Sequence, residues 1–305
     1  MGQAPKGQTS LSGQTGQGAT PKQRKPVIRV LGERNTGTRA MAQMIKALPH
    51  IRENFSQPLD PKAQPILDLL ERAAKIEQQE IGGNAKQSAL SDAVSLAKPR
   101  VACWKHAMLG WDDSFASLSG ALLSQRNPYS WVIALFARPY HHVGRRISAL
   151  STFIETPWLS IPRERMDLVV ASPAALWNAK QAGAQRFAAS AEIPTAFVSF
   201  EPFLADPVAT LAAALEALGL DPAGLRPLAH STKTNEPIDA VQARHAAEPW
   251  RNWLTSAQVS MINAHLDPAV MQAAGYEIEN PDDFADTLSV EHSSALQTYQ
   301  QLRLK

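Results

Sequence analysis

The sequence predicts an α/β fold, a three-layer sandwich with a mainly parallel sheet. Three apolar stretches in the first half, 27–31, 100–104 and 129–137, have the length of buried strands, and a glycine or a basic residue follows each directly. Helix-compatible segments separate them, and this alternation produces parallel strands covered by helices. With 305 residues, of which 44% are hydrophobic and 19% charged, the chain can bury a substantial core.

The elements of the first half follow from local patterns. The run Val27 to Leu31 is apolar and β-branched, 40–48 is compatible with a helix, and 51–55 could form a second short strand. Asp112 to Ser114 would cap a helix over 115–123. The run 129–137 then predicts the clearest core strand, and a helix would follow it.

In the second half, capping residues mark where the helices begin. Ser172 before Pro173 predicts a helix start, and 195–199 a short strand. Asp206 with Pro207 would cap a helix closed by Gly219, with apolar residues on one side at Val208, Leu211, Leu215 and Leu218. Thr255 would cap a late helix.

The domain organisation follows from composition. Residues 1–25 are rich in Gly, Gln, Ser and Thr, which predicts a disordered N-terminal tail. We expect one α/β domain over 26–279, with a helical insertion at 60–97 where apolar residues recur at helical spacing. The stretch 280–305 is expected to be a polar C-terminal tail with one helix at its end.

Charge and cysteine content limit the class of protein. Four basic residues and no acidic one lie in 1–26, so the net charge of +2 for the whole chain becomes −2 for the remainder. That balance argues against a nucleic-acid partner, and any anion site must be local. The single Cys103 excludes an internal disulfide and a Cys-rich zinc site. With no secretory signal and no apolar run of membrane-spanning length, we expect a cytoplasmic protein without an integral membrane segment.

The loop Gly32-Glu-Arg-Asn-Thr-Gly-Thr-Arg39 joins the first strand to a helix, which is an anion-binding geometry. Its two glycines have the spacing that begins a Walker A loop, but Thr38 and Arg39 stand where that motif has Lys and Ser/Thr. Metal-dependent ATP or GTP hydrolysis is therefore poorly supported. The alternative is a surface turn that binds no ligand.

This loop resembles the 5′-phosphosulfate loop of the PAPS-dependent sulfotransferases, in the bacterial-type variety Gly-Glu-Arg-Asn-Ser-Gly-Thr with Thr36 in place of Ser. The resemblance implies a P-loop nucleotide-hydrolase-like fold of the sulfotransferase type, with PAPS as donor and no metal. It also implies that the donor is bound by Arg34, Asn35, Thr36, Gly37, Thr38 and Arg39.

The triplet Trp104-Lys105-His106 is similar to one that some bacterial sulfotransferases carry after the next strand. The resemblance implies that His106 takes the proton of the acceptor, since its ordinary pKa lies near neutrality. Lys105 would steady the charge on the bridging oxygen of the leaving phosphate. Considered alone, a Lys-His pair at a strand end is more often a pair of solvated polar residues.

The segment after 129–137 resembles the 3′-phosphate segment of that family, a strand followed by Arg, a nearby Pro and a Ser one to two helical turns on. Arg138 would grip the 3′-phosphate with its fork of donors. Ser148 and Arg146 compete for the second position. The neighbouring His141 and His142 do not predict a metal site, because adjacent helical residues face different sides.

A late segment around 200–220 is also similar to sulfotransferases, where its role is structural, so Glu201 is not a catalytic candidate. The implied function is transfer of a sulfuryl group from PAPS to a hydroxyl or amine of an acceptor, a carbohydrate, a glycolipid or a small molecule. The alternatives are a nucleotide-dependent phosphotransferase and a non-catalytic interaction domain with the same fold. The sequence specifies neither the acceptor nor the oligomeric state.

Overall fold

The computed structural model describes residues 24–53, 72, 104–109, 115–139, 147–160, 164–246 and 248–304. The expectations for the N-terminal tail up to residue 23, for nearly all of the insertion 60–97, for the strand over 100–103 and for residues 140–146 therefore lie outside the described residues. The described part is a mixed α/β structure, and its main sheet is parallel.

The main sheet has four strands in the order β2-β1-β3-β6, all parallel: β1 is Val27–Gly32, β2 Arg52–Glu53, β3 Gly120–Gln125 and β6 Thr195–Ser199. In the central pair, Ile28 lies opposite Gly120 and Gly32 opposite Ser124. The strands at 27–31 and 195–199 are thus confirmed. A separate antiparallel hairpin joins β4 (Trp158–Leu159) to β5 (Val169–Val170).

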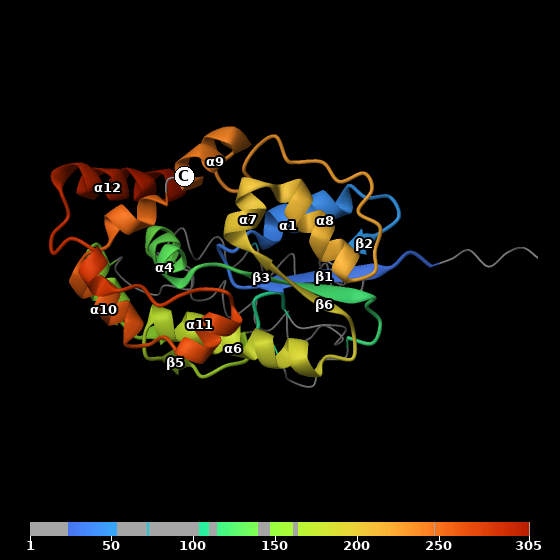
Figure 1. Cartoon of the computed structure of the whole chain (residues 1–305), viewed down its shortest axis with the longest axis horizontal. Coiled ribbons are helices and arrows are strands. Elements are labelled where there is room, and N and C mark those ends of the chain that lie inside the picture. Colours follow the sequence, from blue (N-terminus) through green and yellow to red (C-terminus); the bar gives the residue numbers. More distant parts are fainter. Residues whose placement is uncertain are drawn as a thin grey trace, which may run out of the picture.

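Helices cover the two faces of the sheet (Figure 1), with α1, α7 and α8 on one face and α6 on the other. The helices are α1 (Thr38–Lys46), α4 (Pro128–Ala137), α5 (Leu150–Glu155), α6 (Pro173–Ser190), α7 (Phe200–Ala205), α8 (Pro207–Ala217), α9 (Ile238–Ala246), α10 (Ser256–Asn263), α11 (Pro268–Ala273) and α12 (Val290–Leu304), with short 3₁₀ helices η2 (Pro249–Trp253) and η3 (Pro281–Asp283).

Two predictions for the middle of the chain are wrong. The stretch 129–137, expected to be the clearest strand, lies in helix α4, and 115–123, expected to be a helix, contributes most of the central strand β3. All ten residues of α4 are buried, so its apolar residues show no helical period. Asn127 begins α4, because its side chain accepts from the backbone N–H groups of Tyr129 and Ser130.

The predicted helix starts are confirmed. Ser172 accepts from Ala175 N at 3.1 Å and Asp206 from Ala209 N at 2.9 Å. Thr255 forms a capping box with Gln258. Gly219, with a φ of 71°, follows the end of α8 in the left-handed conformation.

A second core region surrounds α4, beside the sheet (Figure 1). It includes Trp131, Trp253 and Val259 from α4, η2 and α10. The expected C-terminal helix is α12, and its Leu296 and Tyr299 are buried in this region. The last helix is therefore part of the core, although its sequence is polar.

Candidate anion-binding site

The glycine loop leads from the end of β1 to the start of α1, and its backbone needs residues without bulky side chains. Gly32, Asn35 and Gly37 all have positive φ, at 142°, 66° and 86°. A Cβ on Gly32 would lie 2.5 Å from the backbone oxygen of Ser124, which leaves no room for any other residue. The N-cap of α1, Gly37, makes no side-chain hydrogen bond to the helix, and the first N–H groups of a helix have no partner within it.

The Thr36 hydroxyl points into the loop. Its Oγ1 donates to the carbonyl oxygen of Glu33 at 2.5 Å and lies 2.6 Å from Ser124 Oγ. Because the only hydroxyl proton of Thr36 is used on Glu33, Ser124 is the donor of the second bond. Thr36 and Thr38 are both buried. The Thr36 side chain therefore ties the loop to β3.

The side chains of Arg34, Asn35 and Arg39 in the loop differ in their contacts and in their exposure to solvent. The guanidinium of Arg34 lies 5.1 Å from the centre of the Trp104 ring, and the carbonyl of Arg34 accepts from Trp131 Nε1 at 2.7 Å. Arg39 is exposed on α1, whereas Asn35 is buried.

Lys105 and His106 lie directly against the loop, as the convergence of strand ends at one sheet edge predicts. The amide of Gly32 donates to the carbonyl oxygen of Lys105 at 2.9 Å, and His106 Nδ1 lies 2.5 Å from the carbonyl oxygen of Gly32. The His106 ring also meets the Trp104 ring edge-on, with 4.9 Å between centres. The pair therefore belongs to the loop structure and is not a solvated pair.

Burial and neighbouring cations shift both side chains of this pair. Burial lowers the pKa of His106 well below its ordinary value, and Lys105 and Arg34 lower it further. Burial, followed by Arg34 and Arg39, lowers the pKa of Lys105. A carbonyl oxygen only accepts, so the neutral His106 ring carries its proton on Nδ1. Its Nε2 is then the atom able to take a proton.

Sequence reasoning missed Arg126, which follows β3 directly and is buried. Its Nε donates to Ser130 Oγ at 2.8 Å, its Nη1 donates to the carbonyl oxygen of Asn35 at 3.0 Å, and its guanidinium lies 4.3 Å from the centre of the Phe200 ring. Arg126-Asn127-Pro128 and Ser130 form a strand, Arg, Pro, Ser pattern of the kind expected at Arg138. The signal was therefore present in the sequence, one element earlier.

Arg138 and Ser148 occupy other places. Arg138 is exposed and follows the last residue of α4, so the length of that helix, about 15 Å, separates it from the end of β3. Ser148 is exposed in the segment before α5. Neither residue lines the two pockets described below. Arg146 lies outside the described residues.

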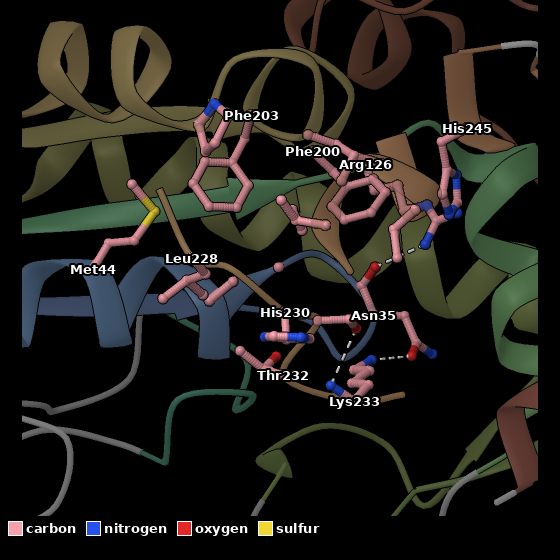
Figure 2. A pocket seen from close by; sticks show the side chains of 17 residues that line it. Asn35, Met44, Arg126, Phe200, Phe203, Leu228, His230, Thr232, Lys233 and His245 are labelled. Atoms are coloured by element: carbon pink, nitrogen blue, oxygen red, sulfur yellow. Dashed lines mark hydrogen bonds between the residues drawn. The ribbon is translucent and has the colours of Figure 1, made fainter. Parts of the chain in front are cut away.

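A pocket opens beside the glycine loop, with an empty volume of about 740 Å³ including the part open to solvent. One wall is apolar and comes from Met44, Phe200, Phe203 and Leu228, while Arg126 and Lys233 lie at the loop side (Figure 2). Lys233 Nζ donates to Asn35 Oδ1 at 2.5 Å, so the loop around residue 233 reaches across to the glycine loop.

A smaller cavity, with an empty volume of about 440 Å³ including the part open to solvent, lies next to the same loop. Glu33, His106, Gln125 and Lys180 line it, and it shares Arg126 with the larger pocket. The imidazole of His106 therefore borders a cavity on one side and the carbonyl of Gly32 on the other.

No protein-family model matches the chain, and no curated protein matches it. Among the residues that the structure describes, no three His, Cys, Asp or Glu side chains are grouped so that they could hold a metal ion. Within the same ranges, no helix combines the length and apolar character needed to cross a bilayer. The chemical interpretation of the site consequently depends on its own geometry and residues.

Proposed function

We propose that the chain is a PAPS-dependent sulfotransferase of the P-loop type, acting on a hydroxyl or amine of an acceptor. The observation that carries the proposal is the pocket beside the glycine loop, which combines an aromatic and aliphatic wall with cations from Arg126 and Lys233. A purine ring needs an apolar slot, and phosphate or phosphosulfate groups need backbone N–H groups and cations. Those two requirements are met side by side.

The loop residues would hold the 5′-phosphosulfate of the donor. The N–H groups of the segment 34–39 and the positive end of α1 supply the anion-binding geometry, and Arg34 and Arg39 add charge. Lys105 adjoins this loop through its carbonyl bond to Gly32 and would stabilise negative charge on the oxygen that leaves with the phosphate.

Arg126 would hold the 3′-phosphate from the end of β3. A guanidinium presents paired donors that suit a phosphate, and two of the Arg126 donors are already fixed by Ser130 and Asn35. Lys233, which also contacts Asn35, would contribute a second cation at the loop side of the pocket. The family resemblance implies Arg138, with Ser148 or Arg146, for the same role, and variants of Arg126 and Arg138 separate the two possibilities.

His106 would act as the base. In the transfer, the acceptor oxygen or nitrogen forms a bond to sulfur, the bond from sulfur to the bridging phosphate oxygen breaks, and PAP leaves with that electron pair. The acceptor proton would pass to His106 Nε2, which is unprotonated in the neutral ring because Nδ1 faces the Gly32 carbonyl. A carbohydrate or glycolipid acceptor follows from the family resemblance alone, and a cytoplasmic location is proposed on the sequence pattern alone.

The test is calorimetric titration of the full chain with PAP and AMP, with and without Mg²⁺. We expect PAP to bind at least tenfold more tightly than AMP, because the 3′-phosphate meets cations, and Mg²⁺ to have no effect. Arg126→Lys, checked for folding by urea denaturation, should weaken PAP about tenfold and leave AMP nearly unchanged. Arg138→Ala is the companion variant and should bind PAP as the wild type does.

Other outcomes would redirect the proposal. Loss of PAP binding in Arg138→Ala, with Arg126→Lys unaffected, would assign the 3′-phosphate to Arg138. If ATP is titrated in the same way, tighter binding of ATP with Mg²⁺ than of PAP would favour a phosphotransferase. No binding of either nucleotide at high concentration would contradict the sulfotransferase proposal and favour an interaction domain.

A further inference from the structure

Helix α6 holds two segments that meet at the candidate site, the end of β3 and the segment around His106. Trp177 Nε1 donates to the carbonyl oxygen of Arg126 at 2.8 Å, and Gln181 Nε2 donates to Gln125 Oε1 at 2.7 Å. Lys180 Nζ donates to the carbonyl oxygen of His106 at 2.5 Å. Lys180 and Gln181 follow Trp177 by three and four positions, so one side of α6 supports both β3 and the segment around His106.

Lys180 also lies between two buried carboxylates. Its Nζ is 3.4 Å from Glu33 Oε2 and 3.5 Å from Glu164 Oε2, and the side chains of Lys180, Glu33 and Glu164 are 8%, 6% and 0% exposed. Charges buried to this degree are costly unless each has a partner of opposite sign. The ammonium is the cation common to both carboxylates.

Glu33 connects this cluster to the glycine loop. Its Oε1 accepts from the backbone N–H of Arg34 at 2.6 Å, and its carbonyl oxygen accepts from Thr36 Oγ1. Glu164 connects the cluster to the segment that follows His106, because its carbonyl oxygen accepts from Met108 N at 2.7 Å. A change at Lys180 should therefore alter both the glycine loop and the segment that follows His106.

We propose that Lys180 is a positioning residue, which sets the conformation of the glycine loop and the place of His106 through Glu33 and the His106 carbonyl without touching the bound anion. The proposal rests on the proposed function for the identity of the anion. Its structural part, the support of the loop, stands independently of that function.

The charge of the cluster also makes anion binding sensitive to pH. The charged groups that act on Glu164 are Lys180, Glu33 and Arg34, and burial is the largest influence, raising the pKa of Glu164 to about 7. Ionisation of Glu164 above that pH adds a negative charge behind the loop, which opposes an incoming anion. Below it, the ammonium and the Glu33 carboxylate form a neutral pair.

The first experiment is titration with PAP at pH 6 and pH 8. Lys180→Met should weaken PAP binding about tenfold at pH 8, whereas Lys180→Arg, which keeps the charge, should recover most of the affinity. Arg186→Met, on an exposed position of the same helix, is the matched control and should bind as the wild type does. Lys180→Met binding within twofold of the wild type would overturn the proposal.

Glu164→Gln separates positioning from mere stability. PAP changes its own charge between pH 6 and pH 8, so the quantity to compare is the dissociation constant at pH 8 divided by that at pH 6, measured for each protein. This ratio should be several-fold larger for the wild type than for Glu164→Gln. Equal ratios would overturn the claim that Glu164 makes anion binding sensitive to pH. This comparison does not use Lys180→Met, so it can be made even if that variant does not fold.

A measurement without ligand keeps this inference distinct from the proposed function. Hydrogen exchange of the Arg34 amide reports its bond to Glu33 directly. Its protection should fall about tenfold in Lys180→Met, fall by a smaller factor in Lys180→Arg, which keeps the charge, and stay unchanged in Arg186→Met. If the wild type binds no PAP but protection falls as stated, the proposed function fails and the positioning role holds. Unchanged protection would overturn the positioning role.

Discussion

Lys233 Nζ donates a hydrogen bond to Asn35 Oδ1, across 198 residues of sequence. The contact brings a loop from the last third of the chain onto the glycine loop at the first strand (Figure 2). Both residues line the larger pocket, so the same contact closes one side of the candidate site.

Replacing Lys233 with Ala should weaken PAP binding about tenfold and change the free energy of unfolding by less than about 1 kcal/mol, because the side chain is only partly buried. Lys233→Arg keeps the charge and is the matched control. Calorimetric titration at low and high salt checks both variants, since a direct charge contact loses strength with salt. Equal affinity for Lys233→Ala and the wild type would remove Lys233 from the site.

Gly37→Ala should destabilise the fold by about 1–2 kcal/mol, because an alanine is strained at a φ of 86° and its Cβ would lie 3.3 Å from the Phe200 ring. It should also abolish PAP binding, since the loop amides would shift. Gly219→Ala is the control: it has similar backbone strain at a φ of 71°, has open space around the added Cβ, and follows α8 away from the site. Urea denaturation and titration should separate the two variants; similar PAP affinities would contradict the loop assignment.

The contribution of Glu164 to stability should fall as pH rises from about 4.5 to about 7. Burial raises the pKa of Glu164 from 4.5 to about 7, so over that interval the folded state holds a proton that the unfolded state has released. The corresponding loss is about 3 kcal/mol from this group. Burial raises the pKa of Glu53 to about 7 as well, so the effect of Glu164 is the difference between the wild type and Glu164→Gln. Urea denaturation at pH 5 and pH 8 measures it, and parallel pH curves would contradict the assignment.

Tyr129→Phe should cost about 1–3 kcal/mol of stability. The Tyr129 hydroxyl donates to Asn263 Oδ1 and accepts from the backbone N–H of Glu279 at 2.9 Å. The Tyr129 side chain is buried, so removing the hydroxyl leaves Asn263 and Glu279 each without one hydrogen bond. A double-mutant cycle with Asn263→Ala, measured by chemical denaturation, isolates the interaction energy between the side chains of Tyr129 and Asn263. A cost near zero would mean that water replaces the hydroxyl.

The first strand, the glycine loop and α1 could be predicted because their signals are local. A β-branched run, two glycines at a fixed spacing and a helical pattern need no tertiary information. The same holds for the caps at Ser172, Asp206 and Thr255, where one side chain binds backbone a few residues away.

Helix α4 and strand β3 could not be told apart by periodicity, since both are buried on all sides. Asn127 before Pro128 is the local helix-start signal, and it places the end of the preceding strand at Gln125, directly before Arg126. Lys180 and Lys233 carry no local signal at all. Their partners, Glu33 and Asn35, lie far away in the sequence, and only the packed chain brings them together.

The burial of α4 has a consequence for how the protein is made. Its apolar surface is covered partly by α12, whose Leu296 and Tyr299 are made by the ribosome long after α4 itself. Until α12 has been made, the part of the apolar surface of α4 that α12 covers remains exposed, which is the condition under which chaperones engage a growing polypeptide. A ribosome stalled before residue 290 would release a chain unable to complete this core.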